Sequence, residues 1–253
     1  MGCLLALRRA GLGLTILLAA SMAGCAETDT DRTPAELLSI ASAGLEGVDR
    51  YTFRSRTTVR SGGIILHELE SYEGEIAGHA VRAIRSLSDG PAPAADEAET
   101  PASRLAELAS PDAEIAYAGE APEGCVALVV KLPADAATRD IGNRLTRQFE
   151  LAADMAASGL ADGVLRSGDG AEASAFRRAL ADETASFRRE LDRLLAGLEA
   201  ETTATVTIDR RTMLPVALEE KSVLKYEAGG RTRTEEWVTR TTLDGFDGRP
   251  SSS

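Results

Sequence analysis

The chain has 253 residues, of which 28 are Lys or Arg and 40 are Asp or Glu, so its formal net charge at pH 7 is −12. This acidic balance disfavours nucleic-acid binding, because contacts to phosphates need clustered cations. A chain of this length can bury most of its unfolded surface in one domain, so it needs no disulfide framework. Only Cys125 of the three cysteines lies beyond the leader region, so we expect no internal disulfide and a thiol packed in a buried strand.

Residues 1–24 have the layout of a secretory signal peptide. Arg8 and Arg9 precede an apolar core over residues 10–20, and small residues follow up to Gly24. The apolar run is too short and too interrupted for a membrane-spanning helix, which needs about 20 apolar residues. We therefore expect this segment to be removed after export.

The residues Met22-Ala23-Gly24-Cys25 resemble the lipobox of bacterial lipoprotein precursors, although Leu is usual at the position of Met22. The resemblance implies cleavage between Gly24 and Cys25, diacylglycerol on the Cys25 sulfur, and a fatty acyl chain such as palmitate on the new amino terminus. Two or three acyl chains hold a protein stably on a membrane. We expect a lipoprotein of the cell envelope, anchored through Cys25 to the outer face of the cytoplasmic membrane or to the outer membrane. An ordinary secretory leader with a chance cysteine is the alternative.

A short tether and a helix are expected next. Residues 25–33 are polar and without periodicity, as is typical of a tether. The segment Thr33-Pro34-Ala35-Glu36 forms a capping box with Pro at the first helical position, which predicts a helix from residue 34. Gly47 is placed to end this helix. Its apolar stripe is Leu38, Ala41 and Leu45.

Residues 51–60 alternate strictly and predict a half-buried strand. Residues 64–76 return as its hairpin partner, and a further strand is expected over residues 79–87. One face of the first strand carries Tyr51, Phe53, Ser55, Thr57 and Val59, and the other carries Arg54, Arg56 and Arg60. We expect the arginines to pair with Glu68 and Glu70 across the hairpin, and binding of an acidic partner is the alternative.

The acidic, Pro- and Ala-rich segment 88–102 is predicted to be a surface loop. A short helix over residues 103–109 follows, and then two strands over residues 113–118 and 125–132. The second strand is an unbroken apolar run, which favours a central position in the sheet.

Two longer amphipathic helices are expected between residues 135 and 200. The stripe of the first is Ile141, Leu145, Phe149, Ala152 and Met155, and that of the second is Phe176, Leu180, Phe187, Leu191, Leu194 and Leu198. We expect both stripes to pack against the sheet and the second helix to seal its inner side, with a partner helix as the alternative. The residues expected to border any ligand cavity are Ile141, Leu145, Phe149, Phe176, Leu180, Phe187 and Leu191.

The last third predicts three consecutive antiparallel strands, over residues 203–208, 215–226 and 231–243, followed by a tail at residues 247–253. The fold class we expect is therefore α+β. One domain over residues 34–246 should contain an antiparallel sheet with helices packed on one face.

The segment TVTIDRRTMLPVALE, which contains Ile208, Asp209, Thr212 and Pro215, resembles the LolA/LppX-like superfamily of bacterial envelope lipoprotein and lipid carriers. In that family an I-D-x-x-T-x-x-P pattern joins two strands of a strongly curved antiparallel sheet, with helices in its concave side. The specific similarity covers about 30 residues. It implies a half-barrel that binds a lipid or another apolar ligand between sheet and helices, whereas the 88–102 segment and the two long helices depart from the compact family form.

No motif in the sequence predicts catalysis. The chain contains His67 and His79 as its only histidines, and it has no nucleophile elbow, phosphate loop or Cys and His pair at zinc spacing. We therefore predict no catalytic residue, no metal and no cofactor. The expected function is ligand binding by a membrane-anchored lipoprotein, and the alternative is a lipid-tethered protein-interaction or sensing module with a solid core. The sequence identifies no protein partner.

Overall fold

The computed structural model describes residues 32–62, 64–87, 99–164 and 171–248, and residues Pro34–Ser253 form one compact unit. The predicted signal peptide, Cys25 and most of the tether lie outside the described residues, as do residues 88–98 of the predicted loop and residues 249–253 of the predicted tail.

Helices and strands follow the order expected for an α+β chain. The helices are α1 (Pro34–Glu46), α2 (Pro101–Leu108), α3 (Ala134–Val164), α4 (Ala171–Ala196) and the short 3₁₀ helix η2 (Phe246–Gly248). The strands are β1 (Arg50–Ser61), β2 (Ile64–Ala77), β3 (Ala80–Ser86), β4 (Glu114–Tyr117), β5 (Cys125–Lys131), β6 (Glu199–Asp209), β7 (Pro215–Ala228) and β8 (Arg231–Asp244).

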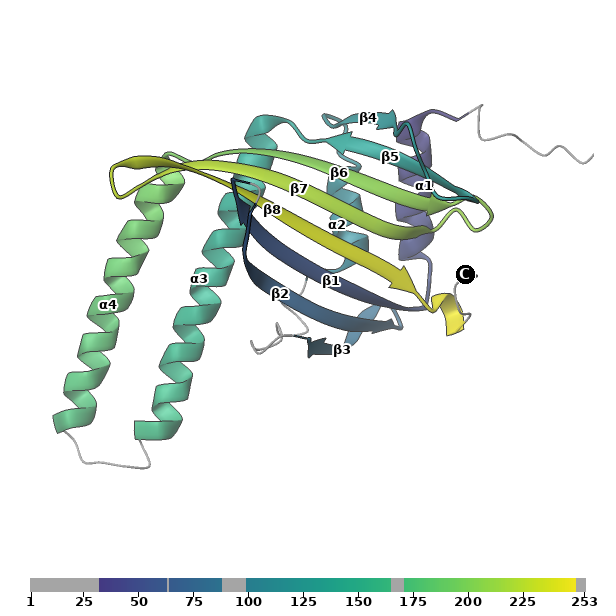
Figure 1. Cartoon of the computed structure of the whole chain (residues 1–253). Coiled ribbons are helices and arrows are strands. Elements are labelled where there is room, and N and C mark those ends of the chain that lie inside the picture. The colour runs from purple at the N-terminus through teal and green to yellow at the C-terminus, as the bar shows by residue number, and fades with distance from the viewer. Residues whose placement is uncertain (1–31, 63, 88–98, 165–170, 249–253) are drawn as a thin grey trace, which may run out of the picture. The chain divides into compact units, whose positions relative to one another are not determined.

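The strands form one antiparallel sheet in the order β3-β2-β1-β8-β7-β6-β5-β4 (Figure 1). Pairing of β1 with β8 joins the N-terminal hairpin to the C-terminal strands, so the two ends of the domain meet in the middle of the sheet. The sheet is open, with β3 and β4 at its edges. These observations confirm the predicted α+β class and the three-stranded C-terminal meander.

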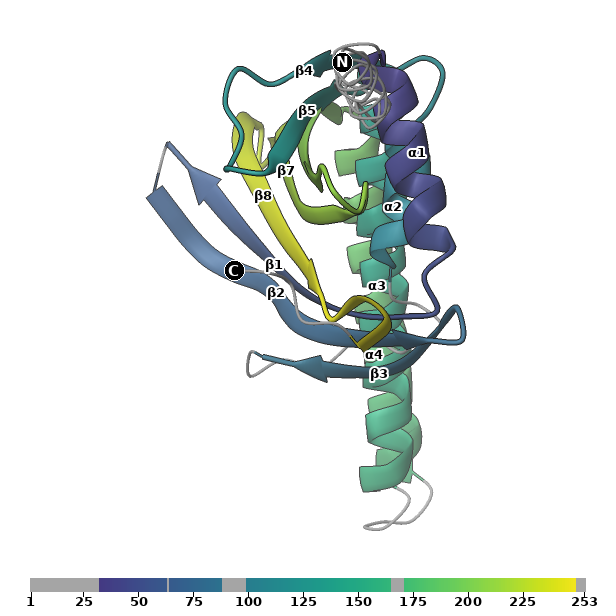
Figure 2. The same cartoon turned by 90° about the vertical axis from the view of Figure 1, so that its right-hand side faces the viewer.

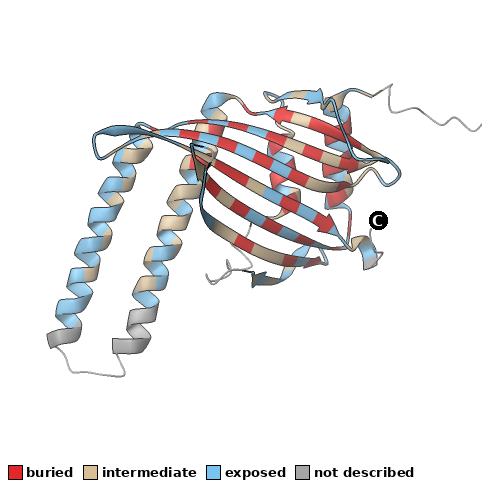
Figure 3. Ribbon diagram, viewed as in Figure 1, coloured by how far each residue is buried: buried red, intermediate tan, exposed pale blue. Residues whose placement is uncertain are grey.

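The sheet curves around helices that lie on its concave side (Figure 2). Along its strands buried and exposed residues alternate, as Figure 3 shows in red and pale blue, because successive side chains point to opposite faces. The predicted inner face of β1 is confirmed, since Tyr51, Phe53 and Val59 are 2–3% exposed and Ser55 and Thr57 are also buried.

Helix α1 confirms its predicted start, end and stripe. It begins at Pro34, and after Glu46 the Gly47 amide donates to the carbonyl oxygens of Ala43 and Gly44 at 3.1 and 3.2 Å. The stripe residues Leu38, Ala41 and Leu45 are buried, as is Leu37. This helix and α2, with Leu105 and Leu108 both 0% exposed, supply much of the helical side of the core.

Helix α2 begins earlier than predicted. The Thr100 hydroxyl accepts from the Ser103 amide at 3.2 Å, and Pro101 occupies the first turn. The predicted loop over 88–102 is therefore wrong at its C-terminal end, because Thr100 and Pro101 are a helix start that the acidic composition obscured. The predicted tail is also too long, since residues 247 and 248 belong to η2.

The predicted central position of β5 is wrong. This strand is second from the edge and pairs with the four-residue β4. Val126, Ala127 and Leu128 are successive residues and all are buried, so the apolar run reflects cover on both faces near the edge of the sheet.

Helix α4 does not seal the concave side, and this prediction is wrong. Helices α3 and α4 form a hairpin that extends away from the sheet (Figure 1). Phe176 and Phe187 are 45% and 53% exposed, whereas Ile141 near the start of α3 is 1% exposed. The physical reason is that α1, α2 and the first turns of α3 already cover the inner face of the sheet. The apolar stripe of α4 therefore predicted an amphipathic helix but did not predict which part of the protein the helix would pack against.

The I-D-x-x-T-x-x-P segment is a tight turn between β6 and β7. The Asp209 carboxylate accepts from the amides of Arg211 and Thr212 at 2.9 and 2.8 Å and from the Thr212 hydroxyl at 3.0 Å. Partial burial alone would raise the pKa of Asp209, but these hydrogen bonds lower it. Ile208 is fully buried and Pro215 begins β7, so each residue of the pattern has a structural role in the turn.

Candidate functional site

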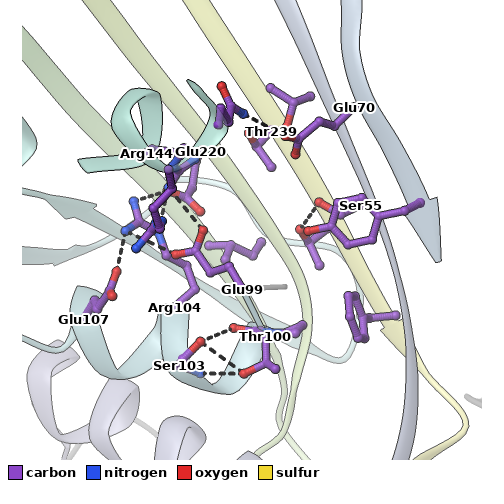
Figure 4. A pocket seen from close by; sticks show the side chains of 18 of the residues that line it. Ser55, Glu70, Glu99, Thr100, Ser103, Arg104, Glu107, Arg144, Glu220 and Thr239 are labelled. Atoms are coloured by element: carbon purple, nitrogen blue, oxygen red, sulfur yellow. Dashed lines mark hydrogen bonds and ion pairs between the residues drawn. The ribbon is translucent and has the colours of Figure 1, made fainter. Parts of the chain in front are cut away.

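A cavity of about 570 Å³ lies between the concave face of the sheet and helices α2 and α3 (Figure 4). Strands β1, β2, β7 and β8 supply one wall, and α2 with the residues just before it and α3 supply the other. The lining contains few aliphatic side chains and many hydroxyl and ionisable groups. It therefore differs from the wholly apolar pocket that the sequence led us to expect.

Hydroxyl groups line the middle of the sheet wall. Ser55 and Thr241 share a hydrogen bond at 3.1 Å, and Thr57 and Thr239 share one at 2.9 Å across the β1–β8 pair. Burial raises the pKa of the neighbouring Tyr72 to about 12, and nearby Glu70 contributes in the same direction. Tyr72 is therefore a neutral phenol at physiological pH, and this middle part of the wall is polar but uncharged.

A buried ion-pair cluster lies at the helical end of the cavity. Arg104 of α2 is 4% exposed, and its Nε and Nη2 atoms donate to Oε2 of Glu220 on β7 at 2.9 and 2.5 Å. Its Nη1 donates to Glu107 at 2.7 Å, and its Nη2 lies 2.9 Å from Asp140 of α3. Burial alone would lower the pKa of Arg104, but the Glu220 carboxylate raises it, so the guanidinium stays charged. One side chain thus ties two helices to the sheet.

Arg144 of α3 extends this cluster toward the cavity (Figure 4). Its Nη2 lies 3.4 Å from Glu99 and 3.5 Å from Asp140. Burial raises the pKa of Glu99, and the charges of Arg144 and Arg104 oppose that rise. The Nε and Nη2 atoms of Arg144 are buried without a hydrogen-bond acceptor among the described residues. Arg144 therefore lines the cavity, whereas its Nε and Nη2 atoms are enclosed by the protein.

A β-bulge places Glu70 and Glu68 on opposite faces of the sheet, with Glu70 on the concave wall. In the register of the β1–β2 pair Thr57 opposes Glu70 and Thr58 opposes Glu68, so Leu69 is the extra residue. Glu68 consequently pairs with Arg56 at 3.3 Å on the outer face, as predicted, whereas the predicted arginine partner of Glu70 is wrong. The Glu70 carboxylate instead accepts from the Gln148 amide of α3 at 2.7 Å.

The cavity is bordered by residues other than those we expected. None of the seven predicted contact residues lines it. The cavity faces a different side of α3, which presents Arg144, Gln148 and Leu151, and no described residue of α4 borders it. Ile141 is buried in the core and Leu145 packs against it. Phe149 stacks under the Arg188 guanidinium at 5.4 Å. Leu180 and Leu191 are partly buried on α4, and the exposed Phe176 and Phe187 lie on the same helix.

The described residues show no centre for metal binding. No three of their His, Cys, Asp and Glu side chains are grouped so that they could hold a metal ion. Cys125 is a free, half-buried thiol at the start of β5. No helix in the described part of the chain is long and apolar enough to span a membrane.

No family model matches this chain, and no curated protein is similar to it in sequence.

Proposed function

We propose that the chain is a membrane-anchored, extracytoplasmic lipoprotein that binds a ligand between its sheet and its helices and does not catalyse a reaction. The observation that carries the binding role is the cavity of about 570 Å³ on the concave side of the curved sheet. Cavities of this size commonly hold small molecules or parts of lipids. The lipobox-like segment ending at Cys25 supports the anchor.

The residues that line the cavity indicate which ligands it can bind. Contact with an acyl chain would remove water from charged groups of the lining and would be unfavourable; these groups are Glu70, Glu99, Arg104 and Arg144. Phe53 and Leu218 provide apolar surface beside them. We therefore propose an amphiphilic ligand whose polar part lies in the cavity. The open, curved antiparallel sheet with helices in its concave side supports a relationship to LolA/LppX-like carriers.

The experiment compares two tryptophan substitutions on adjacent residues of α3. Leu151→Trp places a larger side chain in the cavity, whereas Ala152→Trp adds the same side chain at an exposed position outside the lining. Both variants and the original chain are purified from membranes, extracted with organic solvent and analysed by mass spectrometry. We expect one compound to copurify with the original chain and with Ala152→Trp, and to be depleted from Leu151→Trp. Equal recovery from all three, or recovery from none, would contradict the proposal.

A second candidate function is that of a lipid-tethered interaction module. The observation that favours it is the α3–α4 hairpin, which leaves Phe176 and Phe187 of α4 about half exposed. Replacement of both by Ser should then abolish capture of an envelope protein and leave the copurified compound unchanged.

A further inference from the structure

Glu70 differs from Glu99 and Glu220, the other carboxylates of the cavity that are at least partly buried. Glu220 and Glu99 each lie within 4.0 Å of a guanidinium nitrogen. In the described part of the chain, the one hydrogen bond to the Glu70 carboxylate comes from the uncharged Gln148 amide, and no Lys or Arg nitrogen lies within 4.0 Å of it. A partly buried carboxylate without a cation is unfavourable, and a positively charged group placed beside it would relieve that cost.

The lining as a whole carries excess negative charge. The cavity is bordered by six carboxylates and three guanidinium groups. Two of those guanidinium groups, Arg104 and Arg144, already lie between carboxylates of the buried cluster. A concave surface of this kind attracts cations and disfavours phosphates and carboxylates, because its low-dielectric walls focus the field.

The ring of Tyr72 lies near the Glu70 carboxylate, and that of Phe53 lies beyond it along the cavity wall. Phe53 and Tyr72 both line the cavity, and their rings meet edge to face with centroids 6.1 Å apart. Tyr72 lies close enough to Glu70 for the carboxylate charge to raise the pKa of its phenol. Ring faces attract ammonium groups, most strongly where water is excluded. Carboxylate, aromatic and hydroxyl groups therefore converge in one part of the cavity.

We propose that the ligand carries a positively charged nitrogen, as in a primary or quaternary ammonium group, and that this nitrogen lies against the Glu70 carboxylate. The inference rests on the proposed ligand-binding function and names the chemical class of the ligand. Gln148 holds the carboxylate in position from α3. Glu99 and Asp140 lie beside Arg144, so this guanidinium offers no unpaired positive charge to an anionic group of the ligand.

The test uses a matched pair of small probes with the full-length chain in detergent. Choline is a quaternary ammonium alcohol, and 3,3-dimethyl-1-butanol has nearly the same shape without the charge. Equilibrium dialysis at constant ionic strength measures the affinity of each probe. We expect choline to bind about 10-fold more tightly than the neutral alcohol or better, because the charge faces a carboxylate at low dielectric.

Two variants test whether the preference for choline comes from the Glu70 carboxylate. Glu70→Gln keeps the size of the side chain and one oxygen that can accept from Gln148, and it removes the charge, so the preference for choline should disappear. Glu75→Gln is the control on the same strand, because Glu75 is exposed and lies outside the cavity lining. It should leave both affinities unchanged. Trp237 fluorescence verifies that each variant is folded.

The inference is overturned if choline and the neutral alcohol bind equally to the original chain, if neither binds, or if Glu70→Gln retains the preference. Failure of the proposed function has a different signature. A copurified compound without a cationic nitrogen contradicts the ammonium inference and leaves the binding role intact. Absence of any copurified compound contradicts the binding role itself.

Discussion

Replacement of Arg104 by Met should be among the most damaging single substitutions in the domain. Arg104 is 4% exposed and donates two hydrogen bonds to Glu220, which is 7% exposed. Met fills much of the same volume but leaves the Glu220 carboxylate buried without a cation. Removal of one partner from a buried ion pair costs about 3–5 kcal/mol. That is a large share of the roughly 5–15 kcal/mol by which a typical domain is stable.

The cost arises from the Glu220 carboxylate, which remains buried and loses its cation when Arg104 is replaced. Adding Glu220→Gln to Arg104→Met should recover about 1–3 kcal/mol at pH 8 by removing the unpaired charge.

Urea unfolding followed by Trp237 fluorescence measures these free energies. The control is Arg139→Met, because Arg139 forms an ion pair with Asp135 at 2.9 Å in which both side chains are about 70% exposed. That variant should lose about 0.5 kcal/mol or less. A loss below about 1 kcal/mol for Arg104→Met, or no recovery on adding Glu220→Gln, would refute the role assigned to the buried cluster.

Three further predictions concern the lipid anchor, the α3–α4 hairpin and the contact between Gly74 and Phe53. Cys25→Ser should leave the chain without diacylglycerol and with its leader uncleaved, which mass spectrometry of membrane and soluble fractions can measure. A cleaved, soluble chain without lipid from the unmutated sequence would instead indicate an ordinary secretory leader. Phe187→Ala should cost less than about 1 kcal/mol in urea unfolding, because Phe187 is 53% exposed, whereas Ile141→Ala should cost about 2–5 kcal/mol. Equal losses would place α4 in the core. Gly74→Ala should cost about 1–3 kcal/mol, since a Cβ at Gly74 would lie 2.4 Å from Cζ of Phe53, and a neutral effect on the melting temperature would contradict that contact.

Local signals in the sequence predicted most of the elements. The capping residues before α1 and the alternation of β1 depend on neighbours within a few positions, so they can be detected in one sequence. The segment 205–219 also predicted its turn, because Asp209 and Thr212 satisfy the backbone within the turn itself. The tertiary position of α4 was not predictable in this way, because its apolar stripe is compatible with a core, a partner or a second helix.

The candidate site was predicted less well because its parts are distant in the sequence. Arg104, Asp140 and Glu220 come from α2, α3 and β7, and no local pattern brings them together. One signal of a polar site was present in the sequence. Ser55 and Thr57 place hydroxyl groups on the otherwise apolar buried face of β1, and buried hydroxyl groups need hydrogen-bond partners. The bulge at Leu69 places Glu68 and Glu70 on opposite faces of the sheet, and strict alternation in the sequence does not show it.

Native mass spectrometry of the protein purified from membranes, after expression of the full-length chain, tests most directly the proposal that it is a lipid-anchored binding protein. It measures covalent and noncovalent additions to the same molecule. We expect a polypeptide that begins at Cys25, carries the mass of its acyl chains, and releases one small ligand on collisional activation. A chain of unmodified mass, or a lipidated chain with no releasable ligand, would contradict the proposal.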